Sequence, residues 1–338
     1  MLAAQTELKY AQKVKEFIRQ KDIFNLEYLL VKELGFIYFP IVKKMKIPHA
    51  TVVDTKFSFP LKPRDPSIEG VLKEKLTAAE LKLIPRSQEV IGTILILEIP
   101  PELEKKQRVI AEGYLQINKS IETVVRKDEM HSGQFRTRKV KWLAGKKTTE
   151  TIHLENGVRI QLDIEQVYFS ARSGHERLRI ARLVKKGERV LVMFCGAAPF
   201  PLTIAKNSEA REIYGIEMNP QAHIYAVGNV AENRFQDRIV LREGDVRLIV
   251  PMIQGLFDRI VMPLPKTSEE FLPLALTKIK REGMIHLYAF LEEDEVMRYK
   301  KKVKKLCGKR MVKIVRVVKC GQFSPRVFRM CLDIKVLN

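Results

Sequence analysis

The second half of the chain alternates strand-like and helical patterns, and this alternation limits the possible folds more than any other feature of the sequence. From about residue 166 onward, strands are predicted at 189–194, 212–217, 239–241, 257–262 and 283–290. Helical patterns lie between them at 200–206, 220–233 and 268–279. Such alternation is typical of an α/β domain with a doubly wound, mostly parallel sheet. The last two predicted strands, 312–319 and 326–336, have no helix between them and are expected to pair antiparallel.

The first half of the chain is interrupted by a proline-rich segment at 59–66, which we interpret as a linker. Before it, a helix is predicted at 11–20 and a short strand at 36–41. We therefore predict a small N-terminal domain at residues 1–62.

The segment after the linker mixes helix and strand, which predicts an α+β middle domain at 67–165. A strand at 92–99 precedes a helix at about 102–115. Asn156-Gly157 then separates two strand patterns, and this dipeptide favours a two-residue hairpin turn. The α/β domain would follow at 166–338.

The charge of the chain indicates a polyanionic partner. Lysine and arginine total 61 against 40 acidic residues, which gives a net charge of +21. Release of counterions from phosphates drives the binding of such proteins to nucleic acid. Two tracts concentrate the charge: 126–147 has eight basic residues against two acidic ones, and 298–319 has eleven and no acid. Part of the second tract is expected to be a solvated helix face, the commoner fate of a charge run.

Other features exclude whole classes of protein. No run of about 18 apolar residues predicts a membrane span, and the N-terminus has charges where a secretory signal would be apolar. The four cysteines have no CxxC spacing, so we predict neither a metal site nor a disulfide framework. A reduced, cytoplasmic setting is the expectation.

The end of the first strand of the α/β domain is the predicted cofactor site. The apolar strand runs into the small residues Cys195-Gly196-Ala197-Ala198, which let a ligand approach the backbone closely. A dinucleotide fingerprint has three glycines and this loop has one, so a nucleoside without a pyrophosphate fits better.

Two acidic residues follow the next two strands. Glu217 ends the second strand, where a carboxylate can accept hydrogen bonds from both ribose hydroxyls. Asp245 follows the third strand and could accept one from an adenine amino group. Each acid taken singly could equally be a solvated loop charge, but their order along the chain favours the cofactor site.

Several segments together carry a family resemblance: 135–138 (FRTR), 153–157 (HLENG), 167–177 (VYFSARSGHER) and 193–200 (MFCGAAPF). With them, the chain resembles the tRNA guanine-37 N1-methyltransferases of archaea and eukaryotes, a group that includes a sister aminocarboxypropyl transferase of wyosine biosynthesis. The resemblance implies a C-terminal Rossmann-like class I methyltransferase domain, a small N-terminal tRNA-recognition domain and a middle domain. It also implies S-adenosylmethionine as the cofactor and tRNA as the partner; we predict a monomer.

The resemblance assigns roles to two residues. Guanine N1 carries a proton, so its methylation needs a general base and a donor for the charge that grows on O6. The base would be Glu176 and the O6 donor Arg136. From the residues alone, Glu176 could instead be an ordinary acid at a helix N-terminus, and Arg136 a phosphate contact. The predicted cofactor-binding residues are Phe194, Gly196, Glu217, Asp245, Arg177 and Pro263.

The sequence departs from the family pattern at three positions. Val192 and Ala171 replace an acid and a proline, and Pro263 stands where the family has the asparagine of Asn-Leu-Pro. Proline offers neither a side-chain donor nor a backbone N–H. Two alternatives therefore stay open, namely transfer of the aminocarboxypropyl group of the same cofactor and a non-catalytic RNA-binding homologue.

Overall fold

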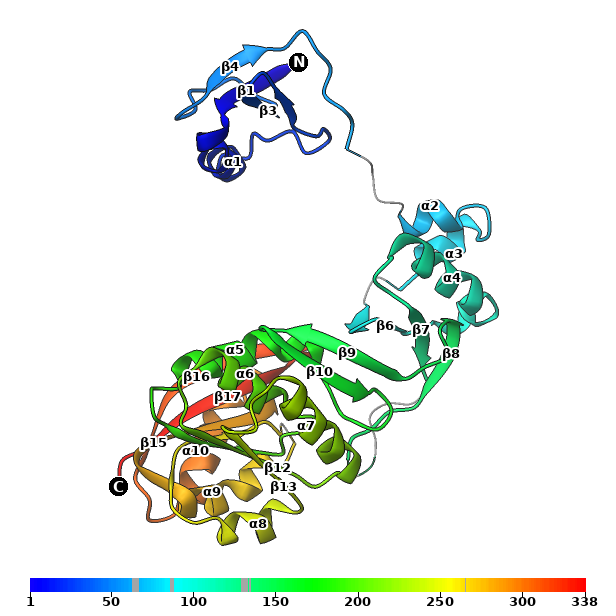
Figure 1. The fold of residues 1–338 in the computed structure, drawn as a ribbon. Coiled ribbons are helices and arrows are strands. Elements are labelled where there is room, and N and C mark those ends of the chain that lie inside the picture. Colours follow the sequence, from blue (N-terminus) through cyan, green and yellow to red (C-terminus); the bar gives the residue numbers. More distant parts are fainter. Residues whose placement is uncertain (63–66, 86–87, 129–132, 134, 265) are drawn as a thin grey trace. The chain divides into compact units, whose positions relative to one another are not determined.

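The computed structural model describes residues 1–62, 67–85, 88–128, 133, 135–264 and 266–338 (Figure 1). The chain divides into two compact units, Met1–Gly70 and Val71–Asn338, which are described separately below. Residues 63–66 of the predicted linker, and Pro265 after the fourth parallel strand, lie outside the described residues. Within the described residues, no helix is both long and apolar enough to cross a bilayer.

The first unit is a four-stranded antiparallel sheet that packs against one helix. Its elements are β1 (Leu2–Glu7), α1 (Ala11–Gln20), β2 (Val31–Glu33), β3 (Phe36–Pro40) and β4 (Thr51–Asp54), in sheet order β2-β3-β1-β4. Val14 and Ile18, one helical turn apart, pack with Phe39 in a shared core. The predicted helix and the strand at 36–41 are confirmed, but the sequence did not reveal the other strands.

The middle part of the chain combines short helices with a second four-stranded sheet. Its elements are α2 (Ile68–Leu72), α3 (Ala78–Lys82), β5 (Glu89–Ile91), β6 (Ile94–Leu97), α4 (Gln107–Ile117), β7 (Thr123–Lys127) and β8 (Val140–Gly145), with strand order β5-β6-β7-β8. The predicted helix at 102–115 is a 3₁₀ turn, Pro101–Lys106, followed by α4. It buries Ile110, Ala111 and Tyr114.

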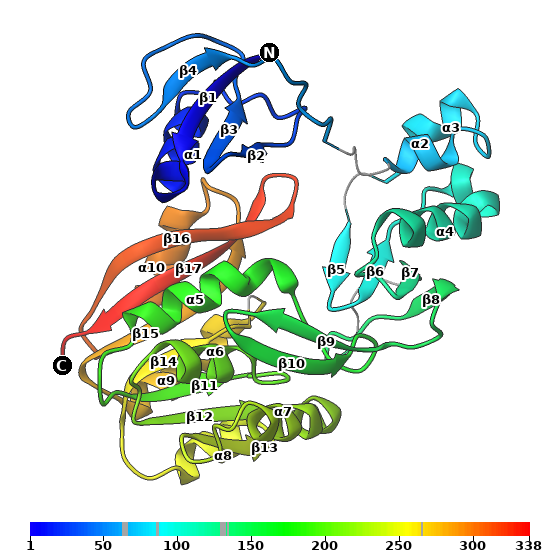
Figure 2. The ribbon, with the colours of Figure 1, turned by 45° about the horizontal axis from the view of Figure 1, so that its top comes forward.

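The predicted hairpin forms between β9 (Glu150–Glu155) and β10 (Val158–Asp163). Asn156 and Gly157 both have positive φ, at 49° and 80°, as a type I′ turn requires. The hairpin lies against α7 (Pro220–Glu232), whose Asn229 side chain accepts from the backbone N–H of Gln161 at 2.7 Å (Figures 1 and 2). The sequence placed this hairpin in the middle domain. Because it packs with the C-terminal part, we propose a domain boundary near residue 149.

The C-terminal part is built on a seven-stranded sheet of order β13-β12-β11-β14-β15-β17-β16. Its strands are β11 (Arg189–Met193), β12 (Glu212–Glu217), β13 (Ile239–Glu243), β14 (Phe257–Met262), β15 (Ile279–Leu291), β16 (Val312–Ser324) and β17 (Val327–Val336). The first five in spatial order run parallel, and β17 pairs antiparallel with both β15 and β16. This is a Rossmann-like sheet, as predicted.

Alternation along β11 separates the two faces of the sheet. Val190 and Val192 point into one core, with α5 (Gly174–Leu183), α6 (Pro199–Asn207) and α7. Leu191 and Met193 point into the other, with α8 (Val246–Met252), α9 (Leu272–Lys278) and α10 (Val296–Leu306). Helices cover both faces, which explains why the strand is apolar throughout.

The basic tract at 298–319 spans most of α10 and the start of β16. Only Tyr299 and Val303 of α10 are buried, so most of its lysines face solvent, as expected for part of this tract. The sequence indicated a helix face in this tract but not the bounds of α10, and it did not predict α8.

Candidate active site at the carboxyl ends of the parallel strands

A cavity of about 230 Å³ opens where β11, β12 and β14 end and α5 begins. Seven of the eight predicted site residues line it: Arg136, Glu176, Arg177, Phe194, Gly196, Glu217 and Pro263. The eighth, Asp245, does not. The cavity therefore joins the two groups of residues that the sequence assigned to cofactor binding and to catalysis.

The loop after β11 forms the floor of the predicted cofactor site. Phe194, Gly196 and Ala198 have φ of +61°, +57° and +66°. Left-handed backbone is uncommon for residues other than glycine, and strain of this kind clusters where backbone must approach a ligand. The N–H of Cys195 is fixed by the carbonyl of Ile216 at 2.8 Å, which ties the loop to β12.

Glu217 is held rigidly at the end of β12. One carboxylate oxygen accepts from the N–H of Gly196 at 2.7 Å and the other from the N–H of Asn219 at 2.8 Å. Burial raises the pKa of Glu217, while these backbone donors act in the opposite direction. A carboxylate has about four acceptor positions, so this one keeps capacity for ribose hydroxyls.

Asp245 lies outside the lining of the cavity, as far as the described residues define it. It is the N-cap of α8 and accepts from the N–H of Arg247 at 2.8 Å. Its carboxylate also pairs with the Arg247 guanidinium at 2.5 Å, and these hydrogen bonds lower the pKa of Asp245. The structure thus gives Asp245 a capping role, and its contact with adenine stays a prediction.

Arg177 lines the cavity, but its guanidinium is already engaged. It donates through two nitrogens to the carboxylate of Glu155, both at 2.5 Å, and to the carbonyl of Ser170 at 3.1 Å. Burial alone would raise the pKa of Glu155, but hydrogen bonds from His153 and Arg177 bring it below its usual value. This ion pair links β9 to α5. Arg177 therefore has a structural role in the wall of the cavity.

Phe194 and Pro263 contribute an apolar edge. The Phe194 ring packs edge-on against Phe271, with centroids 4.9 Å apart. Pro263 and Leu264 follow directly after β14 and line the same side. Apolar walls with a few convergent polar groups are the usual make-up of a small-molecule site.

Arg136 and Glu176 reach the cavity from distant parts of the chain. The Arg136 guanidinium lies 4.6 Å from the centroid of the Tyr168 ring, a cation–π contact that fixes its position. Glu176, in the first turn of α5, is only 6% exposed. Its carboxylate accepts from the Tyr288 hydroxyl at 2.6 Å and from two nitrogens of Arg179 at 2.7 and 2.8 Å.

Among the residues of this site that sequence reasoning missed are Tyr288, Arg329 and Arg179. Tyr288 and Arg329 lie on β15 and β17 and line the cavity, yet neither belongs to a recognisable motif. Arg179 follows Glu176 by three positions, so its pairing could have been found from helical spacing.

Comparison with known proteins agrees with the family resemblance of the sequence. A family model for the TRM5/TYW2 methyltransferase domain matches residues 151–315, and one for the TYW2 N-terminal domain matches 68–148. The tRNA (guanine(37)-N(1))-methyltransferase Trm5b of Pyrococcus abyssi is 31% identical over 99% of both chains.

Two solved structures share the fold over most of their length. The complex of aTrm5 with tRNALeu has a TM-score of 0.70 and 27% identity, with full coverage of both chains. TYW2 of P. horikoshii in complex with MeSAdo has a TM-score of 0.69 and 29% identity, covering 81% of this chain and 99% of that one.

Proposed function

Because this chain belongs to the TRM5/TYW2 methyltransferase family, we propose that it methylates N1 of guanine 37 in tRNA, with S-adenosylmethionine as the donor. The observation that carries the proposal is one shared cavity, in which the predicted cofactor residues other than Asp245 and the predicted acid–base residues face the same space. A relative of the same length that is named for this reaction supports it.

The cofactor would lie on the loop after β11. Gly196 presents its backbone there, and Glu217 would accept from the ribose hydroxyls. Phe194 and Pro263 supply apolar surface on the adjoining side. S-adenosylmethionine supplies an electrophilic methyl group, and the residues of the chain provide its position and the handling of the proton.

The target base would enter between Arg136 and Glu176, which requires that it leave its stack in the RNA. Glu176 would take the N1 proton as the N1–methyl bond forms, and Arg136 would stabilise the charge on O6. The pKa of Tyr288 is raised well above its usual range by burial, so its hydroxyl stays protonated and holds the Glu176 carboxylate in place. A monomeric state and a cytoplasmic location remain predictions.

The proposal is tested by mass spectrometry of transcript tRNA after incubation with the protein and S-adenosylmethionine. A mass gain of one methyl group at guanine 37 is the expected result. A gain of the aminocarboxypropyl group would point to the sister reaction, and an unmodified transcript to a binding protein. A transcript with adenine at position 37 is the substrate control and should stay unmodified.

Glu217→Ala is expected to weaken S-adenosylmethionine binding by about 10- to 100-fold, because hydrogen bonds to a charged group are worth about 1.5–3 kcal/mol each. Isothermal calorimetry measures the effect. Glu243→Ala is the matched control, since Glu243 pairs in register with Glu217 on the neighbouring strand but is exposed. Equal affinities of Glu217→Ala and wild type would remove the ribose assignment.

RNA affinity is expected to fall steeply with salt, because the net charge is +21 and basic residues are spread over two tracts. A plot of log affinity against log salt should have a slope of about −0.7 to −0.9 per phosphate contact. The contribution of α10 to RNA binding is tested by a variant in which three exposed lysines of this helix, Lys301, Lys304 and Lys305, are replaced by glutamine. A slope unchanged in that variant would place the contacts elsewhere, and a flat plot for wild type would contradict phosphate binding altogether.

A further inference from the structure

The carboxylate of Glu176 is one end of a largely buried chain of polar groups, namely Arg179, Asp333, His286 and Arg259, on α5, β17, β15 and β14. Arg179 binds Glu176 and also binds Asp333 at 2.8 and 3.2 Å, so one guanidinium bridges two carboxylates. Both carboxylate side chains are at most 5% exposed. The position of Arg179, and through it that of Glu176, therefore depends on Asp333.

His286 is the next group in this series of contacts, and its neighbours determine the tautomer of its ring. Its ring is fully buried, with Nε2 2.6 Å from a guanidinium nitrogen of Arg259 and Nδ1 2.6 Å from Asp333. A guanidinium only donates, so Nε2 accepts and the proton is on Nδ1, which donates to Asp333.

The charge states along the chain follow from these contacts. Burial and the two nearby arginines, Arg259 and Arg179, lower the pKa of His286 despite the attraction of Asp333, so the ring is neutral. Burial opposes ionisation of Asp333, but the hydrogen bonds from His286 and Arg179 bring its pKa far below the usual range. Asp333 is thus a fixed anion beside Arg179.

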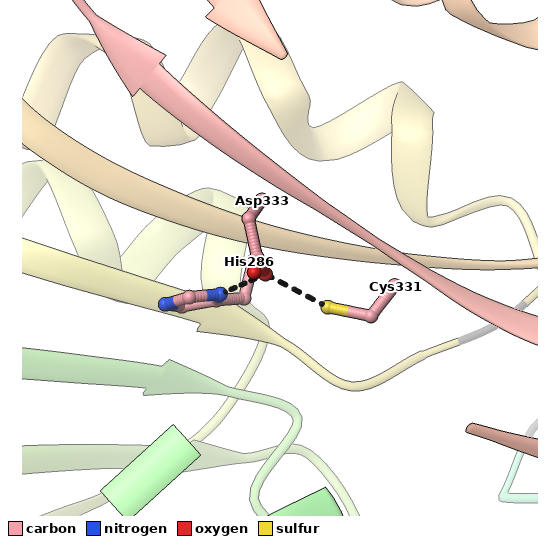
Figure 3. A group of neighbouring side chains, drawn as sticks. All are labelled: His286, Cys331 and Asp333. Carbon is pink, nitrogen blue, oxygen red and sulfur yellow. Dashed lines mark hydrogen bonds and ion pairs between the residues drawn. The ribbon is translucent and has the colours of Figure 1, made fainter. Parts of the chain in front are cut away.

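His286, Cys331 and Asp333 together have the donor types of a metal site, and Asp333 lies between the other two (Figure 3). Their neighbours argue for a different role. A metal ion would compete with the Nδ1 proton and would stand beside the guanidinium groups of Arg259 and Arg179. The group instead completes the hydrogen bonding of Arg179.

We propose that Arg179, held by Asp333 and through it by His286, is a positioning residue that orients the carboxylate of Glu176 and sets the charge beside it. The inference rests on the proposed function, since it concerns the same reaction. Arg179 donates to both oxygens of the Glu176 carboxylate, and Asp333 accepts two further hydrogen bonds from the same guanidinium. Loss of either Arg179 or Asp333 would therefore change both the hold on this carboxylate and the charge beside it.

Other charged or titratable groups share the cavity or contact this chain, and they stay unchanged in the test. They are Tyr168, Tyr288, Glu217, Arg136, Arg177 and Arg329 in the cavity, Cys331 beside Asp333, and Glu188, which binds Arg259.

The test is the single-turnover rate of methyl transfer as a function of pH, with cofactor and tRNA saturating, in Arg179→Gln and Asp333→Asn. Arg179→Gln removes the cation, so the rising limb of the rate should move to higher pH, by about 1–3 units. Asp333→Asn removes the competing anion, so the limb should move to lower pH and the plateau rate should fall. A substitution that merely loosened the fold would not shift the two profiles in opposite directions.

Arg182→Gln is the matched control, because Arg182 lies on the same helix, three residues further on, and is exposed. Its profile should match that of wild type. If Asp333→Asn does not fold, Arg179→Lys replaces it: the retained charge should keep the midpoint near that of wild type, while Arg179→Gln shifts it.

The outcomes separate this inference from the proposed function. Profiles that coincide with wild type, or that move in the same direction, would overturn the role of Arg179 while methyl transfer itself stands. A wild-type protein that transfers no methyl group would overturn both.

Discussion

Glu176→Gln should lower the single-turnover rate of methyl transfer by about 10²–10⁴-fold, the usual contribution of a general base. Glutamine has nearly the same shape and can still accept a hydrogen bond from Tyr288, but it cannot take the N1 proton. Affinities for S-adenosylmethionine and tRNA should stay near those of wild type. Single-turnover kinetics with both ligands saturating measure the chemical step apart from product release.

Glu209→Gln serves as the control, since Glu209 is exposed and pairs only with a surface lysine among the contacts described. A Glu176→Gln rate within about threefold of wild type would show that another group takes the proton. Arg136→Lys in the same assay tests the O6 donor separately. Lysine cannot reproduce the planar fork of arginine, so the rate of Arg136→Lys should fall even at high pH.

Arg259→Leu should lower the free energy of unfolding by about 3–5 kcal/mol, because it removes one partner from a buried ion pair. Arg259 is 3% exposed and binds Glu188 at 2.8 and 3.1 Å, the carbonyl of Leu183 at 2.7 Å and the ring of His286. Leucine leaves these acceptors without a donor inside the fold. The loss should appear in urea unfolding, together with faster hydrogen exchange in β14 and β15.

Hydrogen exchange is needed beside urea unfolding because a chain of two compact units need not unfold in one step. The control is Arg242→Leu, at an exposed position, which should change stability by no more than about 0.5 kcal/mol. A loss below about 1 kcal/mol in Arg259→Leu would mean that desolvation of this pair cancels nearly all of its attraction.

Local chemistry determined much of this protein from the sequence alone. Apolar runs bounded by helical segments predicted the parallel strands, because strands buried on both faces must be apolar throughout. Asn156-Gly157 predicted its hairpin because only a few residues tolerate positive φ at both turn positions. Gly196 and Glu217 follow strand ends, which parallel pairing brings to one edge of the sheet, so their proximity could also be predicted.

Most strands of the N-terminal unit could not be predicted, because their sequence patterns are weak. β2 has three residues and β1 mixes apolar and polar types, so pairing with distant strands determines both. Asp245 follows a strand end as Glu217 does. However, its carboxylate forms an ion pair with Arg247, two residues along the chain. The end of a strand therefore predicts the backbone position of a residue. The orientation of its side chain depends on which nearby groups form hydrogen bonds with it.

Only the tertiary structure brought Arg136, Glu176 and Tyr288 to one cavity, since they come from a loop, a helix and a strand far apart in the chain. The same holds for the chain of charges behind Glu176. Sequence spacing could indicate the pair of Glu176 with Arg179, but Asp333 lies 154 residues beyond Arg179. No local sequence pattern predicts such contacts, because they depend on which strands become neighbours in the sheet. Once these groups are buried, each charge needs a well-placed partner, since an unpaired buried polar group is costly.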